Sequence, residues 1–202
     1  MFGEEQVFLE QYIHIYIHFK NGYGAGYGRT NYDWQSDRAP RGNFNIDVNV
    51  LRKIRTLKDF LDAFKERRLY SLDENAIIDA EKGMNNLYNF YGPDFEVDYD
   101  AGWYDLGNGT GLPAELVQDY FAGYLEDLEE RVSFLNTLDT LCEHSEPDSI
   151  SISRCGDCSE YEDDIEYVID LETGEMKVIV EEEEEIEYVP GIDYETARPE
   201  NE

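Results

Sequence analysis

The stretch PAELVQDYFAGYLEDLEERVSFLNTLDTLC, residues Pro113–Cys142, decides what kind of fold this chain forms. Proline is favoured at the first position of a helix, and Pro147 bounds the segment at its other end. Between the two prolines, apolar residues recur at helical spacing and predict one long amphipathic helix. The predicted apolar stripe consists of Val117, Phe121, Tyr124, Leu128, Leu135, Leu138 and Cys142.

The opposite face of this predicted helix is acidic, and Arg131 is its one positive residue. The apolar stripe is expected to pack on a core, whereas the charged face is expected to stay in solvent. The carboxylates expected to point outward are those of Glu115, Asp119, Glu126, Asp127, Glu129 and Glu130.

Charge is distributed unevenly along the 202 residues, whose 47 Asp and Glu against 16 Lys and Arg give a net charge of −31. Residues 1–68 carry a net +2, residues 69–138 a net −13 and residues 139–202 a net −20. A halophilic protein would be expected to spread acid over every surface, which this chain does not do. The charge also excludes a nonspecific grip on nucleic acid, because that grip needs Lys and Arg to neutralise phosphates. The expected partners are therefore basic protein surfaces or metal ions.

Strand-like patterns lie toward both ends of the sequence, where β-branched and aromatic residues are frequent or alternate with polar ones. The predicted strands are residues 7–19, 44–50, 149–153, 165–171 and 175–180. Thr173-Gly174 marks a tight turn between the last two of them. The glycine-rich residues 20–32 predict a hairpin with a flexible glycine rim.

Two shorter helices are expected before the long one. Thr56 and Ser71 each open a capping-box pattern, and the helix that follows Ser71 should stop before Pro93. Residues 94–111 are expected to form an acidic, aromatic, glycine-rich loop. The sequence thus predicts an α+β fold, with antiparallel strands at both ends of the chain and a central helical region.

We expect the segments to form one compact unit with a loose tail, since Leu, Ile, Val, Phe and Tyr are frequent enough to form a core. The segments are a near-neutral strand-and-helix region at 1–68, an acidic helical region at 69–145, an acidic antiparallel β region at 146–190 and a tail at 191–202.

Five consecutive glutamates occur in the stretch VEEEEEIEYV, residues Val180–Val189. The run extends the last predicted strand, and its side chains would alternate between the two faces of a sheet. An edge strand that continues past the core accommodates such a run, and charge at an edge also opposes aggregation. We expect the run to end a larger acidic surface that a partner reads.

Two sets of side chains are candidates for metal chemistry. Cys142, His144, Cys155 and Cys158 supply four zinc-type ligands within 17 residues. The competing interpretation is a group of idle or buried thiols beside a helix end, and a redox pair is the third. His14 and His18 share one face of the first predicted strand, and we expect them to be semi-buried imidazoles with satisfied hydrogen bonds.

The chain resembles the DNA-mimic inhibitors of phages and mobile elements, a class that includes anti-restriction and anti-CRISPR proteins. The resemblance covers residues 69–202 and rests on acidity, aromatic richness and size. It implies an acidic inhibitor, not an enzyme, that blocks nucleic acid from the basic channel of a CRISPR effector or restriction enzyme. The alternatives are an immunity or antitoxin protein that neutralises a basic toxin nuclease, and a zinc-stabilised adaptor module.

The residues expected to bind such a partner are acids of the long helix and of the last strands, with two aromatic anchors. The set is Glu115, Asp119, Glu126, Asp127, Glu129, Glu130, Asp163, Asp164, Glu181, Glu182, Glu183, Glu184, Glu185, Trp103 and Tyr104. We further expect a cytoplasmic protein that contacts neither nucleic acid nor membrane directly. Structural zinc is its one candidate cofactor, and a homodimer is one of its expected states.

Overall fold

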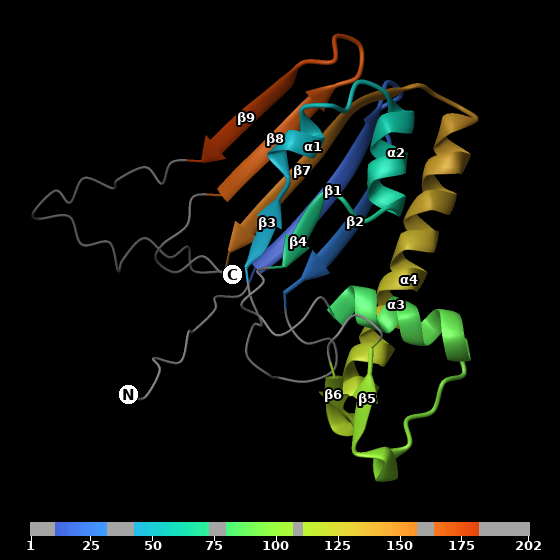
Figure 1. Ribbon diagram of the computed structural model, residues 1–202. Coiled ribbons are helices and arrows are strands. Elements are labelled where there is room, and N and C mark those ends of the chain that lie inside the picture. Colours follow the sequence, from blue (N-terminus) through green and yellow to red (C-terminus); the bar gives the residue numbers. More distant parts are fainter. Residues whose placement is uncertain (1–10, 32–42, 73–79, 107–110, 157–163, 182–202) are drawn as a thin grey trace, which may run out of the picture.

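The computed structural model describes residues 11–31, 43–72, 80–106, 111–156 and 164–181 (Figure 1). Its centre is a five-stranded antiparallel sheet with the strand order β2-β1-β7-β8-β9. These strands are β1 (Gln11–Phe19), β2 (Gly24–Thr30), β7 (Pro147–Gly156), β8 (Asp164–Asp170) and β9 (Met176–Glu181). The first and the last thirds of the chain therefore meet side by side in one sheet, where β1 pairs with β7.

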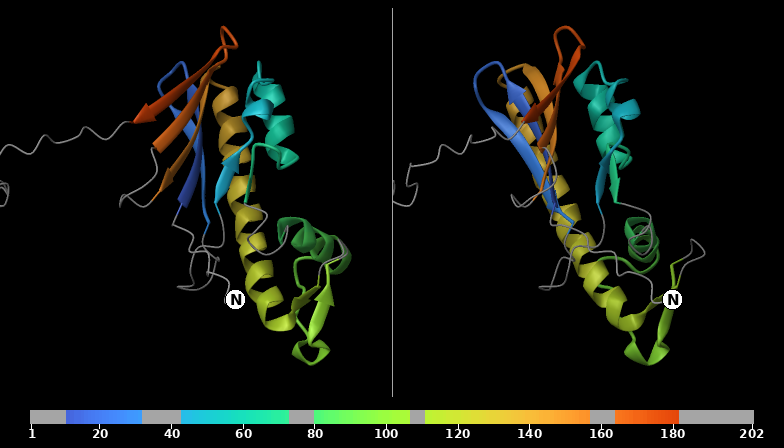
Figure 2. Two further views of the ribbon diagram at one scale, coloured as in Figure 1. Left: turned by 60° about the vertical axis from the view of Figure 1, so that its left-hand side comes forward. Right: turned by 90° about the vertical axis from the view of Figure 1, so that its left-hand side faces the viewer.

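The helices cover one face of this sheet (Figure 2). There are also two small two-stranded sheets in the described residues: the strands of β3–β4 flank the first two helices, and β5–β6 lies between later helices in the chain. The remaining elements are β3 (Phe44–Ile46), α1 (Val48–Leu51), α2 (Leu57–Lys65), β4 (Tyr70–Leu72), α3 (Ala80–Tyr91), the 3₁₀ helix η1 (Tyr99–Ala101), β5 (Trp103–Asp105), β6 (Gly111–Pro113) and α4 (Ala114–Cys142). The fold is thus mixed, with helices and antiparallel sheets. Strands lie toward both ends as expected, but further short strands interrupt the central helical region.

The long helix forms as the sequence predicts. Pro113 is the N-cap residue of α4, and the helix ends at Cys142, before Pro147. Its second half packs against the sheet, while its first half extends beyond the sheet to meet α3 and the β5–β6 hairpin (Figures 1 and 2). One helix therefore joins two packed regions.

Each region has its own hydrophobic core. The first lies between the sheet and the helices, where Ile15, Ile17 and Ile152 belong to one buried cluster with Phe60 and Phe134. The second lies between α3, the β5–β6 hairpin and the first half of α4. Its buried residues are Met84, Leu87, Leu106, Leu112, Val117, Tyr120, Phe121 and Tyr124.

The two faces of β1 differ completely. The isoleucines Ile13, Ile15 and Ile17 are buried, whereas His14 and His18 between them are exposed on the face that the helices leave open. The expectation of semi-buried histidines is therefore wrong. The strand alternates cleanly because only one face of the sheet is covered.

Glycines on the open face of β2 make room for aromatic rings of β1, which explains the glycine-rich segment better than flexibility does. A Cβ atom on Gly24 would lie 2.3 Å from the Tyr16 ring, and one on Gly26 would lie 3.2 Å from it. At Gly28 the nearest atom, in the His14 ring, is 3.4 Å away. The predicted hairpin is confirmed with Gly22 in its turn, but Gly24, Gly26 and Gly28 lie in a paired strand.

Three local expectations are corrected. The strand expected over residues 44–50 stops at Ile46, because the Asp47 side chain accepts a hydrogen bond from the Val50 amide and caps α1. Ser71 lies in β4, paired with Asn45, so it is no helix cap, although α3 does end before Pro93. The loop expected over 94–111 contains η1 and β5. By contrast, the Thr56 capping box of α2 is confirmed, with Asp59 as its second member.

The β8–β9 hairpin turns at Gly174, which has a φ of 71° and donates its amide to the Asp170 carbonyl at 2.8 Å. A positive φ favours glycine, so the predicted Thr173-Gly174 turn is confirmed. β9 is an edge strand of the described sheet, also as expected. The glutamate run after Glu181 and the tail at 191–202 lie outside the described residues.

Candidate partner-binding surface

The second packed region contains a long segment without a basic residue. Residues 83–130 contain 11 Asp and Glu and no Lys, Arg or His, and we call this segment the acidic lobe. Its hairpin end exposes a first group of acids, and α4 exposes a second group. The exposed acids of the lobe are Asp94, Glu96, Asp98, Asp100, Asp105, Glu115, Glu126, Glu129 and Glu130. Asp119 is half-buried.

Aromatic side chains stand among these acids. Trp103 on β5 is 67% exposed, Tyr99 is 59% exposed and Phe90 at the end of α3 is 81% exposed. Tyr104 behaves differently, because it packs against the second core and its hydroxyl accepts a 2.6 Å hydrogen bond from the Asp98 amide. Of the two aromatic anchors expected from sequence, Trp103 is therefore available to a partner and Tyr104 supports the loop.

A groove of about 770 Å³ runs along the outward side of α4, next to the end of α3. Apolar atoms dominate its floor, and Val132, which is 55% exposed, lies on α4 beside it. Its lining includes Tyr88, Pro93, Leu125, Leu128, Glu129 and Val132. An open, largely apolar groove with the Glu129 carboxylate in its lining suits a partner side chain that is apolar and next to a positive charge.

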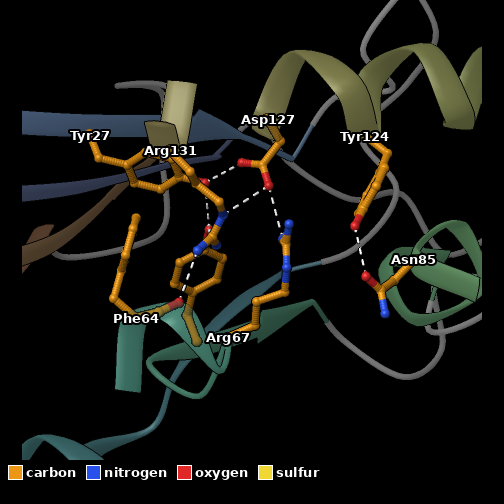
Figure 3. A network of polar contacts seen from close by, with 8 residues as sticks. Tyr27, Phe64, Arg67, Asn85, Tyr124, Asp127 and Arg131 are labelled. Carbon is orange, nitrogen blue, oxygen red and sulfur yellow. Dashed lines mark hydrogen bonds and ion pairs between the residues drawn. The ribbon is translucent and has the colours of Figure 1, made fainter. Parts of the chain in front are cut away.

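The one positive residue of α4 points away from this surface into the protein. Arg131 is buried, and its guanidinium donates to Asp127 at 2.9 Å and to the Phe64 carbonyl oxygen at 2.9 Å (Figure 3). It also lies over the aromatic rings of Tyr27 and Phe64, at 5.1 and 4.4 Å from their centroids. The outward face of α4 therefore exposes carboxylates, whereas the guanidinium of Arg131 lies in the interior.

Asp127 is the centre of this buried network and not a surface acid. It accepts hydrogen bonds from Arg131, from Arg67 at 2.9 Å and from the Tyr27 hydroxyl. Because its side chain is only 4% exposed, the expectation that Asp127 contacts a partner is wrong. The network fixes the rotation of α4 about its axis, since it ties the helix to β2 and to the end of α2.

Electrostatics keep Asp127 ionised. Burial raises the pKa of its carboxyl, but Arg29, Arg131 and Arg67, together with the hydrogen bond from Tyr27, outweigh burial and lower that pKa to about 2. Burial is also the main reason that the pKa of Tyr27 is raised, so its hydroxyl stays protonated and donates to the carboxylate. The network is thus a fixed arrangement of charges at neutral pH, with no group poised to exchange a proton.

Sequence reasoning missed this network because each member looks like an ordinary surface residue. The i,i+4 spacing of Asp127 and Arg131 was the available signal. Whether this pair lies on the surface or in the interior depends on Arg67, which binds Asp127 from 60 residues away in the chain.

The other expected partner-binding residues are scattered. Glu115, Glu126, Glu129 and Glu130 lie on α4 and are exposed. Asp164 and Glu181 lie at the paired ends of β8 and β9, in the other packed region. Asp163 and Glu182, Glu183, Glu184 and Glu185 lie outside the described residues. The acids of residues 94–105, next to Trp103, were not in the expected set, although their density in the sequence could have found them.

Of the four expected zinc ligands, the three that lie within the described residues do not come together. Cys142 ends α4 and His144 lies in the connection just before β7, whereas Cys155 lies near the far end of β7. From Pro147 to Cys155 the strand advances by eight residue steps, which is about 26 Å at roughly 3.3 Å per residue. Cys158, which lies outside the described residues, follows Cys155 by only three positions. No group of three His, Cys, Asp or Glu within the described part of the chain is placed to hold a metal ion.

No family model, curated protein or solved structure matches this chain. Among the helices of the described segments, none is long and apolar enough to cross a membrane.

Proposed function

We propose that this protein is an acidic inhibitor whose lobe imitates the charge of a nucleic acid and occupies the basic channel of a nucleic-acid-binding defence protein. The observation that carries the proposal is the acidic lobe, with exposed carboxylates on two neighbouring elements and no basic residue over 48 positions, 83–130. CRISPR effectors and restriction enzymes are the target classes that the resemblance to phage inhibitors implies.

The spacing of charges along duplex DNA determines how much of the acidic lobe must contribute carboxylates to the imitation. Duplex DNA carries one negative charge per ~1.7 Å of axis. Glu115, Glu126, Glu129 and Glu130 span 15 residues of α4, which is about 22 Å, so α4 supplies one exposed charge per roughly 5–6 Å. The helix alone therefore reaches about a third of the duplex density. The acids of residues 94–105 at the hairpin end are needed to complete the imitation.

Carboxylates and aromatic groups would have different tasks in such a complex. The field of the lobe would steer encounter with a basic channel, an effect that salt weakens. Trp103 and the groove beside Val132 would supply the apolar contacts that carry binding energy after encounter. The lobe provides both within one packed region, and the buried network holds α4 in the orientation that exposes them.

The first experiment identifies the target by affinity capture from a host lysate, with and without excess duplex DNA. A basic nucleic-acid-binding protein that is retained at low salt and released by the DNA supports the proposal. A retained toxin nuclease would instead favour the immunity-protein function. If the retained protein binds no nucleic acid, or DNA leaves it in place, the proposal of mimicry is wrong.

The second experiment measures affinity for that target with charge variants. The triple variant Glu126→Gln, Glu129→Gln, Glu130→Gln removes three exposed carboxylates of the lobe. We expect a loss of about tenfold in affinity, since an exposed ion pair contributes about 0.2–1 kcal/mol. The matched control, Glu143→Gln, Glu172→Gln, Glu175→Gln, removes the same charge outside the lobe. Equal losses in the two variants would show that net charge, and not the lobe, drives binding.

A further inference from the structure

The edge strand β9 leaves a row of aliphatic side chains in solvent. Val178, Ile179 and Val180 are 52%, 45% and 46% exposed, and these consecutive residues point to both faces of the sheet. Edge strands usually carry features that block pairing, such as charge or proline. Between Met176 and Glu181, Lys177 is the only charged residue, so the middle of this edge has little protection.

The hydrogen bonds of the β8–β9 hairpin show which groups face the open edge. The Asp170 amide donates to the Glu175 carbonyl oxygen at 2.9 Å, and the register then pairs Val168 with Lys177. Residues of an antiparallel strand direct their backbone groups alternately to the two sides. Lys177 and Ile179 therefore bond to β8. Met176, Val178 and Val180 direct their N–H and C=O groups outward.

We propose that β9 pairs with β9 of a second copy of this chain, antiparallel and across a two-fold axis at Ile179. This register places Val178 opposite Val180 of the other copy, and both residues have outward backbone groups, as hydrogen-bonded pairs require. Ile179 faces its own counterpart. Lys177 stands opposite Glu181 of the second copy, and such opposite charges across strands are stabilising. The pairing joins the two sheets into one of ten strands.

Neighbouring symmetric registers are worse. An axis at Val178 would place Lys177 opposite Ile179, without a carboxylate partner, and an axis at Lys177 would place Lys177 opposite itself. Like charges in directly opposed positions are destabilising. If the axis passed between two residues, a residue whose N–H and C=O groups point outward would face a residue whose groups already bond to β8. The hydrogen bonds between the two copies could then not form. Within the described strand, the axis at Ile179 thus combines hydrogen bonding, apolar contact and charge pairing.

The association is weak, because pairing of two six-residue strands buries far less than the ~1,200 Å² of a stable interface. The net charge of −31 per copy opposes it further. Salt screens this long-range repulsion more than it weakens short backbone hydrogen bonds. Dimerisation is therefore expected to strengthen as salt is raised, which is the opposite of the behaviour expected for binding by the acidic lobe.

Cross-linking tests the register. In a background with Cys142, Cys155 and Cys158 changed to Ser, Ile179→Cys should form a disulfide-linked dimer when oxidised glutathione is added. Non-hydrogen-bonded pairs have Cα atoms about 4.5 Å apart, within the range for a disulfide. The matched control is Val168→Cys, which lies on the same sheet face but one strand further in. Failure of a folded Ile179→Cys variant to cross-link, or equal cross-linking of Val168→Cys, overturns the proposal.

A charge exchange tests the Lys177–Glu181 pairing in the native protein by sedimentation at about 0.5 M salt, where the Debye length is well below 10 Å. Lys177→Glu should weaken dimerisation about tenfold, and the double variant Lys177→Glu, Glu181→Lys should restore it. A monomer at all accessible concentrations of wild-type protein would overturn the proposal. So would a double variant no better than the single one. Neither result bears on inhibition by the acidic lobe, which lies in the other packed region.

Discussion

At the scale of single residues, Asp127 shows how a carboxylate that reads as surface charge becomes part of the interior. It accepts hydrogen bonds from the guanidinium of Arg131 on its own helix, from that of Arg67 just beyond α2 and from the phenol of Tyr27 on β2 (Figure 3). Removing one member of a buried charge set is costly because the others stay buried without compensation. The network therefore stabilises the fold as a unit.

Replacement of Asp127 by Asn tests this role. The change keeps the shape of the side chain but leaves Arg131 and Arg67 without their anion, so we expect the free energy of unfolding to fall by about 3 kcal/mol. Urea unfolding followed by tyrosine and tryptophan fluorescence measures it. The control is Glu126→Gln, the exposed neighbour, which should change the value by less than about 0.5 kcal/mol. Similar effects of the two variants would contradict the structure.

Lowering the pH should remove the contribution of the ionised Asp127 carboxylate to the free energy of unfolding. The pKa of Asp127 is lowered from 3.8 to about 2 by folding, so its stabilisation is complete above pH ~4 and is lost as the pH falls through ~2. The shift corresponds to about 2 kcal/mol. The difference in stability between the wild-type protein and Asp127→Asn should therefore shrink across this window. A difference that stays constant from pH 5 to pH ~2 would show that the carboxyl is not held ionised.

The glycines of β2 allow a second test with an internal control. Gly24→Ala would place a methyl group 2.3 Å from the Tyr16 ring, whereas Gly28→Ala meets no atom closer than 3.4 Å. The Tyr16 ring must move for the first change, so we expect a loss of about 1 kcal/mol, and Gly28→Ala should be near neutral. Thermal unfolding of both variants gives the comparison. If Tyr16→Ala fails to relieve the Gly24→Ala loss, the ring is not the cause.

At the scale of elements, α3 contains a glycine, Gly83, whose replacement by alanine should lower the free energy of unfolding instead of raising it. Alanine normally stabilises a helix by about 1 kcal/mol over glycine. At Gly83, however, a Cβ atom would lie 2.6 Å from the Leu106 Cδ1 atom and 2.9 Å from its Cβ atom. The Cβ of Leu106 cannot turn away by a change of rotamer. Gly83→Ala should therefore destabilise the protein by about 1–3 kcal/mol.

Urea unfolding measures the effect of Gly83→Ala, and hydrogen exchange shows where it acts. The loss of protection should be concentrated in α3 and in the first half of α4, because Leu106 belongs to the second core. The double variant Gly83→Ala, Leu106→Ala makes room for the added methyl group. Its loss should therefore be smaller than the sum of the two single losses. A Gly83→Ala protein more stable than the wild type would contradict this packing.

Elements with a long periodic pattern were predictable from sequence, and short ones were not. The 29-residue helix α4 and the β8–β9 hairpin carry many agreeing signals, and both form as expected. Residues 44–50 alternate like a strand, but one capping carboxylate at Asp47 turns the chain into α1. Local capping outweighs a weak pattern when a segment is only a few residues long. The short hairpin β5–β6 likewise depends on packing against α4.

Whether a face of a strand or helix is buried depends on which elements pack on it. The alternation within one strand shows that its two faces differ, but not which of them is covered. The alternation in β1 indicated two different faces. Histidines on the uncovered face could be placed only once the helices that pack on the sheet were seen on its other side (Figure 2). For the same reason, the acidic face of α4 was predictable in composition, but the inward turn of Asp127 and Arg131 was not.

At the scale of the whole molecule, charge and fold are in conflict. A net charge of −31 destabilises any compact state by self-repulsion. The structure places 11 of the acids, with no basic residue among them, in a lobe away from the near-neutral segment that supplies β1, β2 and α2. Separation in space reduces the repulsion but leaves a strong field on the lobe, which is the property that the proposed inhibition uses.

This conflict predicts that salt stabilises the free protein. Raising NaCl from about 0.01 to 0.15 M shortens the Debye length from about 30 to 8 Å, so repulsion across the molecule is screened while the buried Asp127–Arg131 contact is hardly affected. We expect the free energy of unfolding to rise by about 1 kcal/mol or more, a sizeable part of ordinary protein stability. Urea unfolding in NaCl and in choline chloride measures it, and equal effects of the two salts identify screening. Lower stability at higher salt would instead mean that surface ion pairs outweigh the repulsion, and the lobe would then not carry the strong unscreened field that mimicry requires.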